Sequence, residues 1–557
     1  MTRERHHRLG DRLLERGMLE LTSLDVALAE QRRAHRPLGE ILVSLGFVRE
    51  RDIAELMGED LGLPFLSASD ITPDTELLES LTESFVREAS AFPYALESGV
   101  LRLAMTHPDD PIQISRVRER FPYPLEIAIT TERDLSELVS THLRSDAQEV
   151  AKIFEEIRAE AELDEEAAPI ERLTTAILHD AIRRGATDIH IEPEEQVTRV
   201  RFRIDGILHG VEGLPVELTP AVISRIKVLS RLDISERRRP QDGRFQMPAD
   251  QKTVDFRVSI LPCPFGENAV LRVLDSGLSM LRLAELGISD EHQALLRSVT
   301  ERSHGIFLVT GPTGSGKTTT LYSLLQEIDG LSRKIATIED PIEYRLPLVR
   351  QSQVDPGIGY DFQNGLRALL RQDPDVILIG EIRDAETAEM AIRAAMTGHL
   401  VFATMHTNSS IGAVPRLMEL GIDRFLIEDT LIGTMGQRLV RTLCKSCKSS
   451  RAPRDDERAW LGDGVSEVWE ANGCERCAES GYSGRTAIAE LFLPPTELES
   501  IVEAALVPKQ VVVDGQRVGY YSSKDEGQRA VRRGRTTFAE VMRVNRSIRL
   551  EGESRAS

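Results

Sequence analysis

The segment GIFLVTGPTGSGKTTTLYSLLQEI, residues 305–328, decides the fold of the region around it. Residues 306–310 are apolar and β-prone, as a buried parallel strand is. The stretch GPTGSGKT at 311–318 matches the pattern GxxxxGK[ST], and a helical pattern follows it. A strand, a glycine-rich loop and a helix in this order predict an α/β domain with a phosphate-binding loop.

Each part of this loop has a chemical reason. Glycines allow a tight turn in which consecutive N–H groups point at phosphate oxygens, and the following helix adds its positive N-terminal end. Lys317 would reach the β- and γ-phosphates of ATP, and the Thr318 hydroxyl would ligate Mg²⁺. The alternative is a chance glycine-rich turn, which the matching context disfavours. The predicted ATP-binding residues here are Gly311, Pro312, Thr313, Gly314, Ser315, Gly316, Lys317, Thr318 and Thr319.

A second strand is expected to supply an acidic side chain beside the metal. In RQDPDVILIGEIRDAET, residues 376–379 read as the strand and Glu381 follows its end. A carboxylate there can order Mg²⁺ or deprotonate the attacking water. Because Gly380 stands where an aspartate would contact the metal directly, a water-mediated contact is left open. Glu381 is the predicted catalytic base.

Further polar residues flank two more predicted strands. Residues 335–338 lead into EDPIEY, which places Glu339 and Glu343 at a strand end, and residues 400–404 lie between His399 and His406. Ligands gather at the carboxyl ends of strands in such sheets. A single acid or histidine is usually structural, but several at successive strand ends favour function. These four residues are therefore candidate catalytic residues.

The composition limits the class of protein. Charged residues make up 29% and hydrophobic residues 41% of the 557 residues, as is ordinary for globular domains. A net charge of −21 argues against a broad nucleic-acid surface. No apolar stretch is long enough to span a bilayer, and the charged start MTRERHHRLG does not read as a secretory signal. A cytoplasmic location is therefore expected.

Five regions follow from the pattern along the chain. Residues 1–64 contain a 29-residue repeat of leucines and glycines, which predicts two similar helical units. A small α/β unit is predicted at 65–145, an acidic linker at 146–169, an α+β domain at 170–280 with a hairpin turn at Asp205-Gly206, and the nucleotide-binding domain at 281–557.

Four of the five cysteines form two CxxC pairs: Cys444, Cys447, Cys474 and Cys477. Two such pairs can hold one Zn²⁺ in a structural tetrahedral site, with an extended loop between them. A redox-active CxxC and two unliganded pairs are the alternatives. Cys263 stands alone between two prolines and is expected to be a packed residue rather than a nucleophile.

Four ordered motifs resemble the secretion ATPase family often called GspE/PulE, which powers type II secretion and type IV pilus assembly. GPTGSGKTTTLY resembles its Walker A motif, ATIEDPIEY its Asp box, RALLRQDPDVILIGEIRDAETA its Walker B region and MTGHLVFATMHTN its His box. RRGATDIHIEP and QDGRF resemble the domain that precedes the motor. The resemblance covers nearly the whole chain and implies a RecA-like motor, and the tetracysteine zinc insertion is also found in many members.

The resemblance further implies a homohexamer in which a neighbouring subunit's preceding domain completes the ATP site. The implied phosphate contacts are Arg257 and Arg272 on that domain and Arg367, Arg371, Arg383 and Arg485 on the motor. A surface salt bridge is the alternative for each arginine. Closure around ATP would move an inner-membrane platform protein, so the protein would associate peripherally with the inner membrane through partners.

The amino-terminal repeats resemble a domain that binds cyclic di-GMP in several relatives. The residues that would carry this role are Arg8, Gly10, Gly17, Gln31, Gly39 and Gly46. The second repeat has Asp60 where the pattern has Gln, and an added carboxylate disfavours a dianionic ligand. A helical module that docks an inner-membrane partner is the alternative, slightly favoured.

Three other functions compete with the assembly motor. A pilus retraction motor resembles it, but such ATPases typically lack the long amino-terminal region and the tetracysteine insertion. A nucleotide sensor with little turnover is disfavoured by the intact Lys317, Thr318 and Glu381, and a nucleic-acid translocase by the charge. The sequence does not distinguish secretion from pilus assembly, and it suggests no role for residues 508–527 beyond a hairpin.

Overall fold

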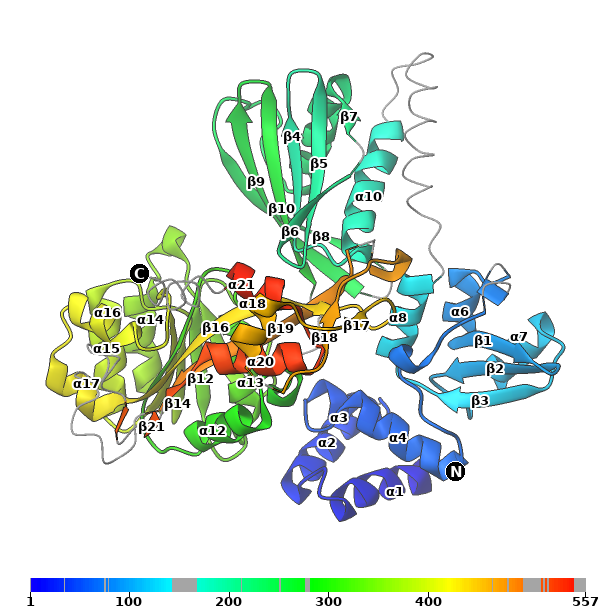
Figure 1. Cartoon of the computed structure of the whole chain (residues 1–557), viewed down its shortest axis with the longest axis horizontal. Helices are drawn as coiled ribbons and strands as arrows, with labels where there is room; N and C mark the ends of the chain where they lie inside the picture. Colours follow the sequence, from blue (N-terminus) through cyan, green and yellow to red (C-terminus); the bar gives the residue numbers. More distant parts are fainter. Residues whose placement is uncertain are drawn as a thin grey trace.

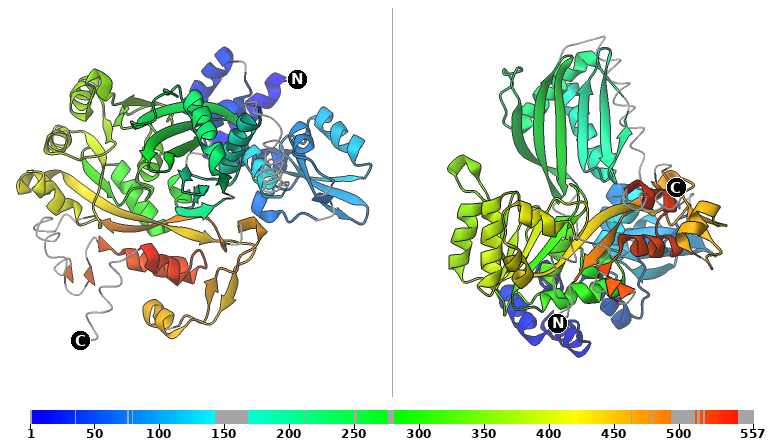
Figure 2. Two further views of the ribbon diagram at one scale, coloured as in Figure 1. Left: turned by 90° about the horizontal axis from the view of Figure 1, so that it is seen from above. Right: turned by 60° about the vertical axis from the view of Figure 1, so that its left-hand side comes forward.

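The computed structural model describes residues 2–34, 36–74, 77–78, 80–142, 168–211, 213–249, 252–275, 281–462, 464–477, 480–493, 512–513, 516–517 and 520–544. Figures 1 and 2 show several bodies, with the amino-terminal helices and the small α/β unit beside the motor and the α+β domain above it. Most of the predicted acidic linker lies outside the described residues; its last two residues belong to helix α10 (Ala168–Arg183).

The 29-residue repeat corresponds to two helix pairs, α1 (Thr2–Glu15) with α2 (Leu21–Ala34) and α3 (Leu38–Ser44) with α4 (Glu50–Leu61). Repeat-equivalent Leu13 and Leu42 are fully buried in their shared core. Gly17 and Gly46 occupy equivalent turns with φ of 67° and 73°, a conformation that glycine adopts without strain. The repeated sequence therefore encodes a repeated helix–turn–helix.

A small α/β unit follows. Its sheet has the order β1 (Ala91–Glu97), β2 (Val100–Met105), β3 (Leu125–Ile129). The helices of this unit are α6 (Glu83–Ala89), α7 (Pro111–Arg120) and α8 (Glu132–His142).

The next domain is a twisted sheet with helices on one face. The strand order is β6 (Ile207–Gly210), β5 (Val197–Ile204), β4 (Asp188–Pro193), β10 (Gly266–Asp275), β9 (Lys252–Cys263), β8 (Gln241–Ala249), with β7 (Leu214–Pro215) against β5. Alternate residues of these strands pack on α10 and α11 (Thr219–Leu229), and no described helix covers the other face. The predicted turn at Asp205-Gly206 joins β5 to β6. Cys263 is exposed at the end of β9, so its predicted packing was wrong: the residue follows the last core-facing position of that strand.

The motor domain is built on a sheet of order β13 (Val349–Gln353), β12 (Ile335–Glu339), β14 (Val376–Ile379), β15 (Leu400–Met405), β11 (Gly305–Thr310), β16 (Leu431–Leu443), β19 (Tyr482–Phe492), β22 (Tyr520–Tyr521). From β13 to β16 the strands run parallel. One face packs on α14 (Phe362–Leu369), α15 (Ala385–Met396), α16 (Ala413–Glu419) and α17 (Arg424–Thr430). The opposite face packs on α12 (Asp290–Thr300) and α13 (Lys317–Gln326).

The long antiparallel pair β16–β19 extends beyond the sheet and carries the cysteine insertion at its end (Figure 1). The insertion contains β17 (Ser449–Arg451), α18 (Asp455–Leu461) and β18 (Val468–Glu470), so it is a folded unit rather than the expected extended loop. Helices α20 (Ser523–Arg532) and α21 (Phe538–Val544) pack against this pair and the insertion. In the described part of the chain, no helix is both long and apolar enough to cross a membrane.

A buried carboxylate fastens α21 to β16. Glu540 is 2% exposed and accepts hydrogen bonds from Arg441 Nε at 3.1 Å and Arg543 Nε at 3.0 Å. Burial alone would raise the pKa of Glu540, but the arginine hydrogen bonds outweigh it and hold the pKa at about 2.

We expect Glu540→Gln to lower the free energy of unfolding by about 3–5 kcal/mol, because it leaves two arginines without their carboxylate. Since the folded pKa is depressed, the same stabilisation is complete above pH 4.5, the ordinary value for Glu, and is lost as pH falls toward 2. Chemical unfolding at pH 7 and a thermal series from pH 6 to pH 3 measure both effects. Equal stability of the variant and wild type at pH 7 would contradict this role.

Candidate functional site

The parallel strands bring the candidate residues to one edge of the motor sheet. The carboxyl ends of β12, β14, β15 and β11 lie side by side in that order, and β16 lies beside β11 and runs past its end. Glu339 is the last residue of β12, whereas Glu381, His406 and the phosphate loop follow β14, β15 and β11. Gln437 and Arg438 lie within β16, directly after its last residue paired with β11. His406 therefore follows the strand between Glu381 and the phosphate loop.

The phosphate loop has the conformation that the glycines predict. Gly311, Gly314 and Gly316 have φ of 144°, 75° and 84°, and α13 begins directly after Gly316. A Cβ on Gly311 would lie 2.6 Å from the Gln437 carbonyl oxygen, so the loop packs too closely for a side chain there. Thr318 occupies the first turn of α13, where its hydroxyl can reach a metal bound to the phosphates.

Lys317 is buried at the floor of this loop. Its Nζ donates to the carbonyls of Gly311 at 2.9 Å and Pro312 at 3.0 Å. Burial lowers the pKa of Lys317, and the nearby Glu381 carboxylate partly offsets that effect. The ammonium group is thus held by weak neutral acceptors, which a phosphate oxygen can replace.

Glu381 is 9% exposed and has cationic neighbours. Its carboxylate forms an ion pair with Arg383 and lies 3.6 Å from His406 Nε2. The backbone on both sides is fixed, since Thr404 Oγ1 donates to the Gly380 carbonyl at 2.6 Å and Ile382 N donates to the Thr404 carbonyl at 2.9 Å. This arrangement suits a carboxylate that orients water or a metal at the phosphate loop.

Glu339 is more enclosed than the sequence suggests. It is 2% exposed and accepts hydrogen bonds from Tyr322 on α13, Thr337 and Gln351. Burial raises its pKa, and these donors partly offset the rise. Glu339 therefore links α13 to β12, while Glu343 lies exposed in the following loop and contributes negative charge that also raises the Glu339 pKa.

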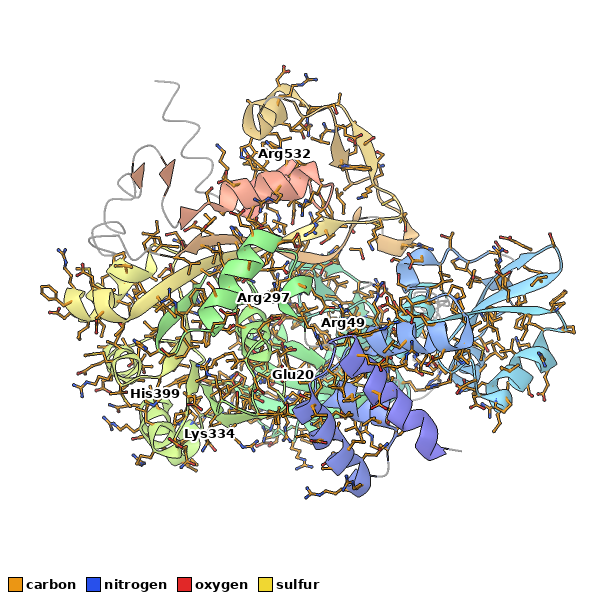
Figure 3. All side chains as sticks on the ribbon, turned by 90° about the horizontal axis from the view of Figure 1, so that it is seen from below. Glu20, Arg49, Arg297, Lys334, His399 and Arg532 are labelled. Atoms are coloured by element: carbon orange, nitrogen blue, oxygen red, sulfur yellow. The ribbon has the colours of Figure 1, made fainter. Side chains whose placement is uncertain are left out.

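The predicted role of His399 is not supported by its position. His399 precedes β15 and His406 follows it, so the whole strand separates them, about 20 Å at 3.3 Å per residue. Figure 3 shows His399 on the same side as Lys334, which precedes the parallel strand β12. His399 Nδ1 lies 2.9 Å from the Ala394 carbonyl. The pattern of a histidine on each side of a strand does not distinguish the two opposite ends of that strand.

Two residues that the sequence did not single out contact the phosphate loop. Gln437 is buried, donates to the Ser315 carbonyl at 2.8 Å and accepts from Thr320 Oγ1 at 2.6 Å. Arg438 donates to the carbonyls of Gln437 and Asn408, and burial lowers its pKa. The adjacent polar residues Gln and Arg in the middle of the strand LIGTMGQRLVRTL were the available signal.

The predicted phosphate arginines fall into separate groups. Arg383 pairs with Glu381, whereas Arg371 donates to the carbonyl of Arg367. Arg485 lies 3.3 Å from Asp205 at the β5–β6 turn of the preceding domain.

Arg257 and Arg272 lie on the helix-free face of the preceding domain, beside a cavity of about 550 Å³. Arg272 pairs with Asp188 at 3.1 Å. Among the described residues, no hydrogen bond or ion pair joins either arginine to the phosphate loop of the same chain.

The cysteine cluster fits a zinc ion. All four Sγ atoms lie within 4.8 Å of one another, and the closest pairs are 3.7, 3.8 and 3.9 Å apart. A tetrahedral site with Zn–S of about 2.3 Å requires S–S separations of about 3.8 Å. Gly481 N also lies 3.2 Å from Cys477 Sγ, a contact typical of zinc-bound thiolates. Four thiolates around one ion leave no position for water, which indicates a structural site.

The candidate cyclic di-GMP residues of the amino-terminal repeats differ in their surroundings. The Arg8 side chain lies outside the described residues, and Gln31 Nε2 donates to the Arg36 carbonyl. A Cβ on Gly10 would meet Leu24 at 2.8 Å and one on Gly39 would meet Ile53 at 3.5 Å, so both glycines serve helix packing.

Asp60, the departure from the repeat pattern, pairs with Arg12. The Gly46 carbonyl accepts from Arg282 of the motor. The second repeat therefore contacts the motor domain.

We expect one Zn²⁺ per purified chain and its loss in Cys474→Ser. Both tryptophans of the chain, Trp460 and Trp469, lie in the cysteine insertion, so their fluorescence reports on it selectively. Loss of zinc should shift this emission to longer wavelength, because the insertion opens to water. The control Cys263→Ser should keep both zinc and emission. If the chelator removes zinc from the wild type and the tryptophan emission does not change, the predicted site is contradicted.

Comparison with known proteins agrees with this geometry. Residues 163–543 match the family model "Type II/IV secretion system protein", and residues 61–149 match the "MshEN domain". The second match covers the small α/β unit and not the glycines of the helical repeats.

The chain is 35% identical over 556 residues to the type IV pilus assembly ATPase PilB of Myxococcus xanthus, covering 96% of this chain and 98% of that protein. It is 38% identical over 559 residues to the type II secretion system protein E of Xanthomonas campestris pv. campestris, with the same coverage. The fold resembles the DotB ATPase of Yersinia pseudotuberculosis, with a TM-score of 0.51 at 22% identity over 69% of this chain and 94% of that one. The predicted RecA-like motor fold is confirmed, and the chain belongs to the type II/IV secretion system protein family as a P-loop ATPase.

Proposed function

We propose that this ATPase works as a homohexameric motor that powers type II protein secretion or type IV pilus assembly at the cytoplasmic face of the inner membrane. One observation carries the proposal. The phosphate loop, Glu381 and His406 lie on the motor, whereas Arg257 and Arg272 lie on a separate sheet with an open face. A site divided in this way is complete only when two domains close on ATP.

The division gives hydrolysis a mechanical consequence. The motor half binds Mg-ATP through the loop, Lys317 and Thr318, with Glu381 orienting the attacking water. The preceding domain adds guanidinium groups, which match phosphate oxygens and stabilise the transferring phosphoryl group. Loss of the γ-phosphate removes the anion that both halves share, so the domains separate. In a ring, this opening and closing would move an inner-membrane platform protein.

For the amino-terminal repeats we propose docking to a partner of the same machine rather than cyclic di-GMP binding. Arg12 pairs with Glu59 and Asp60, and Arg16 pairs with Glu59, so carboxylates already neutralise these arginines and their charge disfavours a dianion. The glycines serve helix packing and turns.

We expect Lys317→Ala and Glu381→Gln each to lower steady-state ATP hydrolysis at least about 100-fold, because both groups act at the transferring phosphoryl. Lys317→Ala should also weaken ATP binding, whereas Glu381→Gln should retain it. Turnover is measured at known oligomeric state, with His399→Ala as the control that keeps activity. Wild type that binds ATP without turnover, even with its membrane partner, would contradict the motor and favour a sensor.

Mixing inactive variants tests whether two subunits share one site. Lys317→Ala and Arg257→Ala should each be inactive alone, because one lacks the phosphate loop lysine and the other the donated arginine. Up to about a quarter of the interfaces in an equimolar random mixture combine two intact halves, so activity should partly return.

Lys317→Ala mixed with Glu381→Gln is the matched control. Both changes damage the motor half, so no interface combines two intact halves and activity should not return. Absence of recovery in the Lys317→Ala and Arg257→Ala mixture, with subunit exchange verified, would contradict the shared site.

A further inference from the structure

The open face of the preceding domain carries three arginines in one register. Arg244 on β8 stands opposite Arg257 on β9, and Arg257 stands opposite Arg272 on β10. Residues directly opposite in antiparallel strands share a face, with Cβ atoms about 5 Å apart. We call Arg244, Arg257 and Arg272 the arginine row. It spans about 10 Å, two strand spacings.

The core fixes the position of Arg244. The next residue, Phe245, stacks on Phe256 with ring centroids 4.7 Å apart and an interplanar angle of 6°. Both rings are buried against the helices. Because successive side chains alternate between faces, burial of Phe245 directs Arg244 to the open face beside Arg257. A slip of one residue would expose the phenylalanine, so the register is strongly specified.

The charges along this row are not balanced. Next to Arg272 stands Asp188 on β4, which pairs with Arg272 at 3.1 Å and lies 3.7 Å from Arg203 on its other side. Asp188 is thus shared between two arginines. In the described part of the chain, Arg244 and Arg257 have neither a hydrogen bond nor an ion pair. Like charges directly opposite each other destabilise a sheet, so this end of the row favours binding of an anion.

The cavity beside the row has the size and lining for such an anion. Its volume is about 550 Å³, within the range of small-molecule sites. All three arginines line it, with Ser259 as a further hydrogen-bonding group and Asp188 and Asp242 at its sides. Planar guanidinium groups spaced along 10 Å suit a ligand with several phosphate oxygens better than a single carboxylate.

We infer that Arg244 is a third phosphate-binding residue of the preceding domain, acting with Arg257 and Arg272 on the terminal phosphate of bound nucleoside triphosphate. Asp188 positions Arg272 without touching the nucleotide. The inference rests on the proposed two-domain site and adds a residue to it. Since the phosphate loop already holds the β-phosphate, the arginine row distinguishes the triphosphate from the diphosphate.

Nucleotide affinity of the full chain tests this role. We expect Arg244→Ala to weaken binding of the slowly hydrolysed analogue ATPγS by about 10- to 100-fold, the effect of losing a charge-assisted hydrogen bond, and to leave ADP affinity unchanged. Arg244→Lys should recover part of the loss. The control is Arg199→Ala, on the same face but paired with Glu194 at 2.8 Å, which should match wild type with both nucleotides.

Parallel measurements on Arg257→Ala and Arg272→Ala separate two failures. If these variants lose ATPγS affinity and Arg244→Ala does not, Arg244 is not a ligand and the two-domain site stands. If all three keep wild-type affinity for ATPγS, the two-domain site itself fails.

Thermal unfolding without nucleotide excludes a merely structural effect. Because Arg244 repels Arg257, Arg244→Ala should unfold at the same temperature as wild type or a higher one, while gaining less stabilisation from ATPγS. A lower unfolding temperature without nucleotide, with equal stabilisation by ATPγS, would overturn the inference.

Discussion

The parallel hydrogen-bond ladder of β12, β14, β15, β11 and β16 is the constraint on which the rest of the structure depends. Parallel strands place all their carboxyl ends at one edge, and helices on both faces bury the strands completely. The loops that leave this edge are the positions where polar groups can face solvent and one another. Glu381, His406, the phosphate loop and Arg438 meet for this reason, although up to 127 positions separate the loop from Arg438 (311 to 438).

Both halves of the proposed site contain cationic groups that have no ion pair among the described residues. Lys317 folds onto two carbonyl oxygens, and Arg244 and Arg257 stand side by side on the preceding domain. The Lys317 ammonium group is held by carbonyl acceptors that a phosphate can replace, and Arg244 and Arg257 have no acceptor within the part of the chain that the structure describes. In the two-domain site that we propose, triphosphate would be the common partner that makes both halves more stable together than apart. By the same chemistry, nucleotide state would control domain closure in the proposed site.

The elements around the motor serve to hold this geometry. Glu540 fastens the carboxyl-terminal helix α21 to β16, the strand that also supplies Gln437 to the phosphate loop. The cysteine cluster closes the far end of the β16–β19 pair, where Cys444 N donates to the Gly481 carbonyl at 3.0 Å. Strand β16 thus connects the cysteine cluster, the carboxyl-terminal helices and the nucleotide site as one stiff element.

Local features of the molecule were determined by the sequence alone. The phosphate loop, the Asp205-Gly206 turn, the repeated helix pairs and the CxxC pairs each depend on a few adjacent residues, whose backbone preferences or ligand spacing act over short range. The tertiary structure decided which distant residues meet. It placed His406 at the site and His399 at the opposite edge, added Gln437 and Arg438 beside the loop, enclosed Glu339, exposed Cys263 and set Arg244 beside Arg257. Strand order and register make these choices, because they depend on burial of whole faces, which no short segment specifies by itself.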